Sequence, residues 1–368
     1  MNNEYTMLEY IYDDGPSLQR TLEENESGII KTLNLIQSEG IENIVVSGIG
    51  SSYTAAVMAA PILRYHSTLP VHIIPTTELS YYAGKLINEK TLIIAISRSG
   101  ERDWVIKGLQ TAMRSGAKGI AMTGVADSSL AQAADSLWFT REGPEKSFPK
   151  TKSVIACSGL LMRFALALAG SNDQLAIDRL IALNNMPTMI TDVVTKLNDE
   201  VKALIPFIKK HKISLITGTG SNYGAALEAT VKIQETSLIT SLSDDTGNLL
   251  HGPTGAINSD WLLMPLVHSS DEQLNIELLK LVGKLGGDTL CITEPGLNVE
   301  SLATEVLELP NRVDLMLAAL AYLPPIQLIN YYWTIALGLN PDQPDAMYKI
   351  LESILPPGRN EPNLEDGR

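Results

Sequence analysis

The sequence is poor in cysteine, in basic residues and in long apolar runs. Its two cysteines, Cys157 and Cys291, lie far apart, which excludes a disulfide framework or a cysteine metal site and fits a reducing compartment. Lysine and arginine number 28 against 42 acidic residues, so the net charge of -14 disfavours nucleic acid and anionic membranes as partners. No run approaches 18 apolar residues, and residues 1–10 lack a signal-peptide pattern. We therefore expect a cytoplasmic protein that does not bind membranes.

What the sequence does contain is enough apolar material for two cores. Hydrophobic residues make up 45% of 368 residues, which predicts two domains of ordinary size. Short β-branched runs alternate with segments of helical periodicity, and this alternation predicts an α/β fold with parallel, doubly wound sheets of flavodoxin-like type. The expected strands are 71–75, 91–97, 117–123 and 136–139, and the expected helices are 53–65 and 103–115.

One segment occurs twice. Val45-Val-Ser-Gly-Ile-Gly-Ser-Ser-Tyr-Thr-Ala-Ala56 returns as Leu215-Ile-Thr-Gly-Thr-Gly-Ser-Asn-Tyr-Gly-Ala-Ala226, so that Gly48 and Gly218 are 170 positions apart. A repeat of this length indicates a duplicated domain rather than a solenoid unit. We expect an N-terminal helical arm at 1–24, domains at 25–170 and 195–340 joined by a helical, proline-interrupted connector around 184–209, and a C-terminal tail at 341–368.

The first glycine-rich loop, Gly48-Ile-Gly-Ser-Ser52, lies between an expected strand and an expected helix. Its glycines allow close backbone approach, and the free amides at the helix N-terminus favour an anion. The loop lacks the third glycine of the Gly-x-Gly-x-x-Gly pattern, which argues against a nicotinamide cofactor.

A second loop, Ser97-Arg-Ser-Gly-Glu-Arg102, combines hydroxyls, a glycine and two guanidinium groups at a strand end. Such groups suit a phosphate monoester, although a serine N-cap followed by an acidic first turn explains the same residues. The matching strand end of the second repeat, Met264-Pro-Leu-Val-His-Ser-Ser270, lacks Ser-x-Ser-Gly. This asymmetry favours a phosphate site in the first half and a different role for the second.

The second half carries ionisable residues near its own glycine loop. Glu228, Lys232 and Glu235 share a face of the helix expected at 225–236, and His251 follows in a glycine- and proline-containing loop. A salt-bridged, exposed helix face explains the first pair equally well, and an isolated loop histidine or the tail residue Lys349 is ordinarily solvated.

Six segments in order resemble the sugar-isomerase (SIS) domain family, and in particular the isomerase half of glucosamine-6-phosphate synthase and its stand-alone relatives. They are Met7–Pro16, Gly48–Tyr53, Ser97–Glu101, Glu145 with Thr151–Ser153, Ala226–Ser237 with His251–Pro253, and Asp342–Pro344 with Lys349. The resemblance covers nearly the whole chain and implies two tandem SIS domains.

The resemblance also implies roles. Glu235 would move a proton between C1 and C2 of an open-chain sugar, and Lys232 would support the sugar hydroxyls or polarise the site. His251 would assist ring opening from a neighbouring subunit, and Lys349 would reach the C2 carbonyl as an amine. Phosphate or substrate binding falls to Gly50, Ser51, Ser52, Ser97, Arg98, Ser99, Arg102, Glu145 and Lys152. A homodimer with shared active sites, no metal and no cofactor are expected.

Differences between this sequence and the family motifs narrow the set of candidate reactions. Arg98 and Arg102 replace the family's glutamine and threonine, which favours a second negative charge on the substrate. The sequence has no glutaminase domain, so amide transfer from glutamine is disfavoured. A glucosamine-6-phosphate deaminase, a fructosamine-6-phosphate deglycase and an aldose-ketose isomerase remain open, with a non-catalytic phosphosugar-binding regulator as the alternative. The sugar and the amine stay undetermined.

Overall fold

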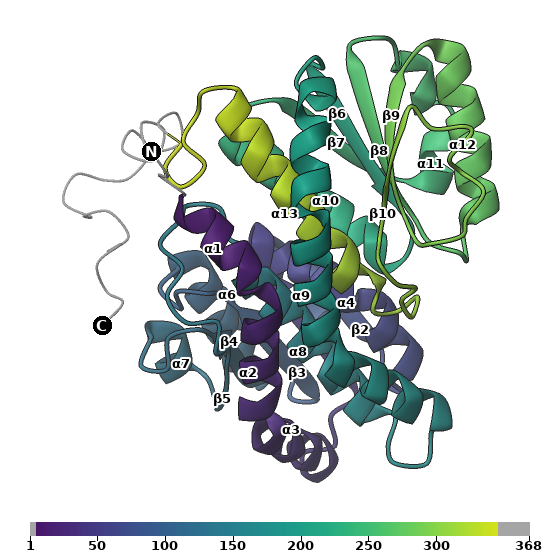
Figure 1. Cartoon of the computed structure of the whole chain (residues 1–368). Helices are drawn as coiled ribbons and strands as arrows, with labels where there is room; N and C mark the ends of the chain where they lie inside the picture. The colour runs from purple at the N-terminus through teal and green to yellow at the C-terminus, as the bar shows by residue number, and fades with distance from the viewer. Residues whose placement is uncertain (1–4, 345–368) are drawn as a thin grey trace.

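The first half of the chain forms a parallel five-stranded sheet in the order β2-β1-β3-β4-β5. A computed structural model describes residues 5–344 and shows this sheet in the lower part of Figure 1. The strands and the helices between them are β1 Asn43–Gly48, α4 Ser51–His66, β2 Val71–Pro75, α5 Thr76–Tyr81, η1 Gly84–Leu86, β3 Thr91–Ile96, α6 Asp103–Arg114, β4 Lys118–Thr123, α7 Ser129–Ala133 and β5 Ser136–Phe139. All the strands predicted from sequence in this half are present.

The second half repeats this topology. Its sheet runs β7-β6-β8-β9-β10, again all parallel, so the first strand of each half lies between the second and the third. The elements are β6 Ile213–Gly218, α10 Ser221–Thr236, β7 Thr240–Asp245, α11 Thr246–Leu250, η2 Pro253–Ala256, β8 Trp261–Val267, α12 Glu272–Leu285, β9 Asp288–Thr293 and β10 Glu305–Glu308. The predicted fold of tandem flavodoxin-like sheets is confirmed.

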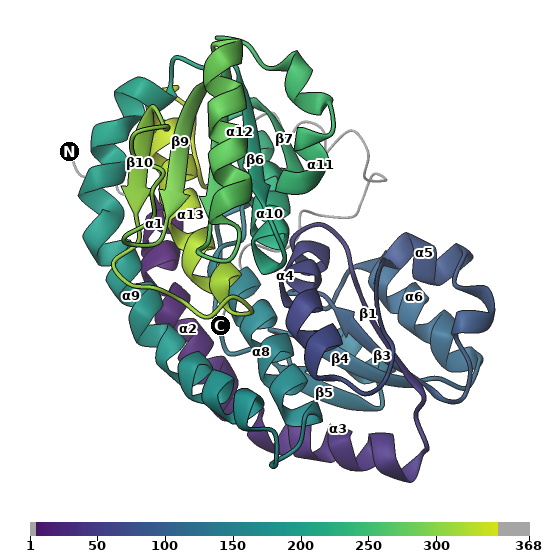
Figure 2. The same cartoon turned by 90° about the vertical axis from the view of Figure 1, so that its right-hand side faces the viewer.

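Further helices join and flank the two sheets. They are α1 Thr6–Tyr12, α2 Asp14–Glu24, α3 Glu26–Ser38, α8 Lys152–Leu168, α9 Gln174–Ile208 and α13 Ala318–Ala336. The connector expected around 184–209 is part of α9, a 35-residue helix that starts earlier and continues through Pro187 and Pro206. Figure 2 shows α9 running along both halves.

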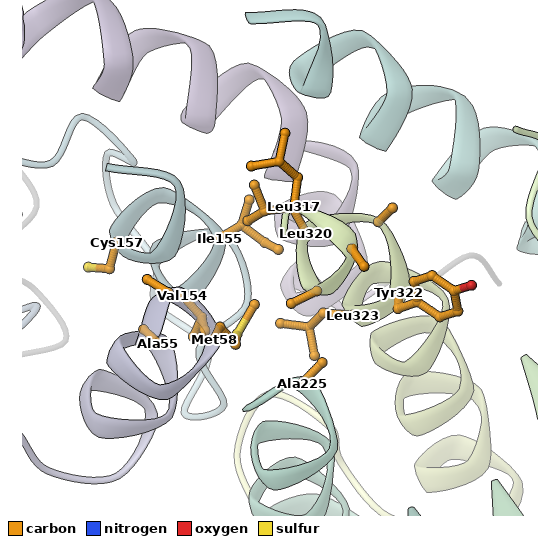
Figure 3. Close-up of a cluster of buried hydrophobic side chains, with 14 of the residues drawn as sticks. Ala55, Met58, Val154, Ile155, Cys157, Ala225, Leu317, Leu320, Tyr322 and Leu323 are labelled. Atoms are coloured by element: carbon orange, nitrogen blue, oxygen red, sulfur yellow. The ribbon is translucent and has the colours of Figure 1, made fainter. Parts of the chain in front are cut away.

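The halves meet where α4 packs against α10. A Cβ atom added at Gly224 would lie 2.4 Å from the Met58 backbone nitrogen, so the two helix backbones approach more closely than any larger residue allows. Side chains of α8 and α13 close around this crossing, and Figure 3 shows Val154 and Leu323 among them. These side chains are buried and belong to one apolar core that extends through both halves. The crossing therefore fixes the first glycine loop relative to α10.

Candidate functional site

The first glycine loop and the Ser97 loop lie at the carboxyl ends of adjacent strands. β1 and β3 are neighbours in register, and their helices start directly after Gly50 and after the Ser97–Gly100 turn. Gly50 and Gly100 have φ of 57° and 67°, a left-handed conformation that favours glycine. Ligands bind at this point of doubly wound sheets, and the N-terminus of α4, whose dipole favours an anion, lies there. The structure thus brings together, at the carboxyl ends of β1 and β3, the predicted residues Gly50, Ser51, Ser52, Ser97, Arg98 and Ser99.

The two arginines of the Ser97 loop differ in their surroundings. Arg102 is exposed and precedes α6. Arg98 is held by the segment after β5, because its Nε lies 3.5 Å from a carboxylate oxygen of Glu142 and its Nη2 donates a 3.3 Å hydrogen bond to the Gly143 carbonyl. Arg98 is therefore partly neutralised, which weakens the argument that both arginines serve a second substrate charge.

Glu145 organises the loop between β5 and α8. Its carboxylate accepts hydrogen bonds from the Thr151 amide at 2.6 Å and the Ser153 hydroxyl at 2.6 Å. Burial disfavours the charge, but Lys150 and these hydrogen bonds outweigh it and lower the pKa of Glu145. Lys152 is also buried, and its ammonium lies 2.9 Å from Asp13. Both predicted residues thus have internal partners.

Lys150, in the same loop, was not predicted from sequence. Its ammonium donates to the carbonyls of Glu145 and Ser147 at 2.9 and 2.6 Å. Burial lowers the pKa of Lys150 to about 8, with repulsion from Arg98 and Lys232 adding to the effect. Glu235 acts in the opposite direction, so Lys150 interacts electrostatically with both the Ser97 loop and α10. A lysine beside the Thr151-Lys-Ser153 motif was visible in the sequence, but its burial was not.

The ionisable residues of α10 form a buried network, so the exposed-face interpretation is wrong. Lys232 Nζ lies 2.6 Å from Glu235 and 3.5 Å from Glu228, and the last two side chains are 25% and 0% exposed. Thr54 of α4 donates a 2.5 Å hydrogen bond to Glu228. Although burial opposes the charge, Glu235 and Glu228 raise the pKa of Lys232. Burial raises the pKa of Glu228 in spite of Lys232 and Thr54.

His251, another predicted catalytic residue, is not part of this network. His251 lies exposed at the C-terminal end of α11. Its expected action from a neighbouring subunit stays a prediction, and Lys349 lies outside the described residues.

Asp342 ties the end of the described chain to its beginning. Its carboxylate accepts the backbone amides of Thr6 and Met7 at 2.8 and 2.7 Å, and its carbonyl accepts the Phe148 amide at 2.7 Å. The Asp-Gln-Pro segment therefore contacts both α1 and the loop that carries Glu145 and Lys150.

Replacing Asp342 with alanine is expected to lower the free energy of unfolding by about 1–3 kcal/mol, because two partly buried amides lose a charged acceptor. Denaturant unfolding would measure the loss. Asp260→Ala, which removes an exposed surface carboxylate, is the control. Equal stability of the two variants would contradict this role of Asp342.

In the second half, carboxylates of the chain itself occupy the carboxyl ends of the corresponding strands. Glu294 accepts the amides of Ser269 and Val313 at 3.0 and 2.9 Å, and Asp271 accepts the Thr219 hydroxyl at 2.5 Å. These carboxylates take the amides and hydroxyl that an anion would use, which agrees with the asymmetry read from the sequence.

Residues 5–344 hold neither a metal-binding cluster nor a membrane-spanning helix. No group of histidine, cysteine, aspartate and glutamate side chains there is suited to hold a metal ion, and no helix there is long and apolar enough to cross a bilayer.

Two copies of a doubly wound, parallel α/β unit in one chain define the class of tandem flavodoxin-like folds. The chain belongs to the SIS domain family, whose domain matches residues 39–167 and 207–337.

The chain resembles curated aminotransferases in sequence. The chain is 28% identical over 362 residues to a glutamine--fructose-6-phosphate aminotransferase (isomerizing) from Caldanaerobacter subterraneus subsp. tengcongensis, covering 94% of this chain but 58% of that protein. It thus spans less than two thirds of the length of this relative. A similar enzyme of Methanothermobacter thermautotrophicus is 28% identical over 356 residues, with 95% and 57% covered.

Solved structures share the fold. The C-terminal domain of glucosamine-fructose-6-phosphate aminotransferase from Francisella tularensis matches with a TM-score of 0.84 and 22% identity, covering 93% of this chain and 99% of that one. Glucosamine-6-phosphate deaminase from Thermotoga maritima matches with a TM-score of 0.74 and 21% identity, covering 93% and 98%. At such identities the likeness concerns the fold.

Proposed function

We propose that this protein is an enzyme that moves a proton between C1 and C2 of a hexose or amino-sugar 6-phosphate. The observation that carries the proposal is the Glu228-Lys232-Glu235 network, joined through Thr54 to the helix that begins at the anion loop. A protein that only binds sugar phosphate has no need of a partly exposed carboxylate held by a buried lysine at this place. Several relatives are named for sugar phosphates, among them an aminotransferase, a glucosamine-6-phosphate deaminase and a tagatose-6-phosphate ketose/aldose isomerase.

The proposed chemistry assigns each group a task. The Gly50 and Ser97 loops hold the phosphate through amides, hydroxyls and Arg98. Lys232 fixes one oxygen of Glu235 by its 2.6 Å contact, and the other oxygen takes the proton from one carbon and returns it to the next. His251 of a second subunit opens the ring, and Lys349 reaches the C2 carbonyl, which makes a homodimer the working unit.

Three outcomes of this shared step are proposed as candidates: ketose-aldose isomerisation, release of ammonia from glucosamine 6-phosphate, and release of an amine from a fructosamine 6-phosphate. All three start with proton transfer at C1 and C2. Lys150, in the loop between β5 and α8, lies within electrostatic range of Arg98, Lys232 and Glu235 and is a further candidate to contact the substrate.

A coupled assay on the purified protein tests the proposal. Fructose 6-phosphate, glucosamine 6-phosphate and a panel of fructosyl-amino-acid 6-phosphates are supplied separately, and glucose 6-phosphate and ammonia are measured. Turnover of any of them supports the enzyme and identifies the reaction. Binding of these ligands without turnover would reject it in favour of a non-catalytic phosphosugar-binding regulator.

A further inference from the structure

Glu142 is a buried carboxylate beside the proposed phosphate loop. Its side chain is 1% exposed, and both carboxylate oxygens are buried without a hydrogen-bond partner. The Arg98 guanidinium lies 3.5 Å away, and its own Nε is likewise buried without a hydrogen bond. Since Arg98 also donates to the Gly143 carbonyl, two consecutive residues of this segment hold the guanidinium.

The fold makes room for this carboxylate. A Cβ atom at Gly124, directly after β4, would lie 2.0 Å from Glu142 Oε1, so only glycine leaves the space. Burial raises the pKa of Glu142 to about 7, and the neighbouring Thr140 hydroxyl and then the Arg98 charge work in the opposite direction.

Other charged or titratable groups also face Glu142. Glu145 of the same loop repels its charge. The Cys157 thiol of α8 lies within electrostatic range, and Arg20 of α2 reaches the Glu142 carbonyl at 3.5 Å. Arg98 is the charge of opposite sign that contacts the carboxylate itself, so the state of Glu142 acts mainly on Arg98.

We propose that Glu142 is a positioning and charge-setting residue for Arg98, holding the guanidinium at the anion loop and offsetting part of its charge toward a bound phosphate monoester. This rests on the proposed phosphate site. When Glu142 is protonated, Arg98 acts on the ligand with its full charge. As the pH rises through about 7, Glu142 ionises, offsets that charge and weakens anion binding.

Calorimetric titration of the full chain with glucose 6-phosphate, and separately with inorganic phosphate, tests this at pH 6, 7 and 8. Because phosphate monoesters titrate near pH 6 and inorganic phosphate titrates close to neutral pH, each pH compares wild type with Glu142→Gln. The ratio of the wild-type Kd to the variant Kd is expected to be near 1 at pH 6 and to rise to about three- to tenfold at pH 8.

Arg98→Gln, which carries the glutamine of the family motif, is the second variant. It should bind more weakly than wild type, and adding Glu142→Gln to it should change neither Kd nor its pH dependence. A ratio that stays constant with pH, or an effect of Glu142→Gln that persists without Arg98, would overturn the inference. If Glu142→Gln does not fold, an unchanged Kd in Arg98→Gln alone overturns it equally. Absence of any binding by wild type would instead reject the phosphate site and the proposed function with it.

Discussion

Glu235→Gln is expected to lower turnover of the active substrate by about 10²- to 10⁴-fold, the usual loss when a positioned general base is removed. The amide keeps the shape of the carboxylate and can still accept the hydrogen bond from Lys232. The Kd for glucose 6-phosphate should therefore change by less than about twofold, because the phosphate loops are untouched.

Steady-state rates and calorimetric titration of the same samples separate these two effects. Glu277→Gln, which changes an exposed carboxylate of α12, is the matched control and should keep its activity. Retained turnover in Glu235→Gln would exclude this residue as the base, and equal losses of rate and affinity would make it a binding residue.

Lys232→Met is expected to lower the free energy of unfolding by about 3–5 kcal/mol, because it leaves two neighbouring carboxylates without their buried counter-charge. Lys232 is 3% exposed and contacts both Glu228 and Glu235. Denaturant unfolding at neutral pH measures the loss.

Lys196→Met is the matched control, since Lys196 forms an exposed i,i+4 pair with Asp192 and should contribute less than about 1 kcal/mol. Combining Lys232→Met with Glu228→Gln should restore part of the stability, because one of the unpaired charges is then removed. Equal stability of the Lys232 and Lys196 variants would show that the network does not support the fold.

The positions of the strands along the chain and of the two glycine- and serine-containing loops could be predicted because they depend on local patterns. A β-branched run followed by glycine and serine predicts a strand, a turn and a helix without knowledge of the rest of the chain, as at Gly48–Ser52. The duplicated segment then predicted that the second half would fold the same way. The loss of Ser-x-Ser-Gly in the second half predicted that the two halves would differ at this strand end, and in the second half Glu294 accepts the backbone amides there.

What the sequence did not reveal depends on contacts between distant segments. The helical spacing of Glu228 and Lys232 was visible, but their burial follows from the close approach of α4 at Gly224 and Met58. Lys150 and Glu142 were missed because an irregular loop buries them, and no periodicity marks such a loop. Asp342 belonged to a recognised motif, yet its hydrogen bonds to Thr6 and Met7 join opposite ends of the described chain.

The helix crossing has a consequence for which ligands fit. α4 starts at the proposed phosphate loop, and its Thr54 holds Glu228 on the helix that carries Glu235. Because the two backbones touch at Gly224, neither helix can slide to adjust the span between the phosphate and the Glu235 carboxylate. On the proposed assignment, the crossing holds the phosphate and the Glu235 carboxylate at a fixed distance, so the number of carbons between the phosphate and the reacting carbon decides whether a ligand fits. The α4–α10 crossing thus selects ligands by the length of their carbon chain. Selection among sugar epimers falls to the loops.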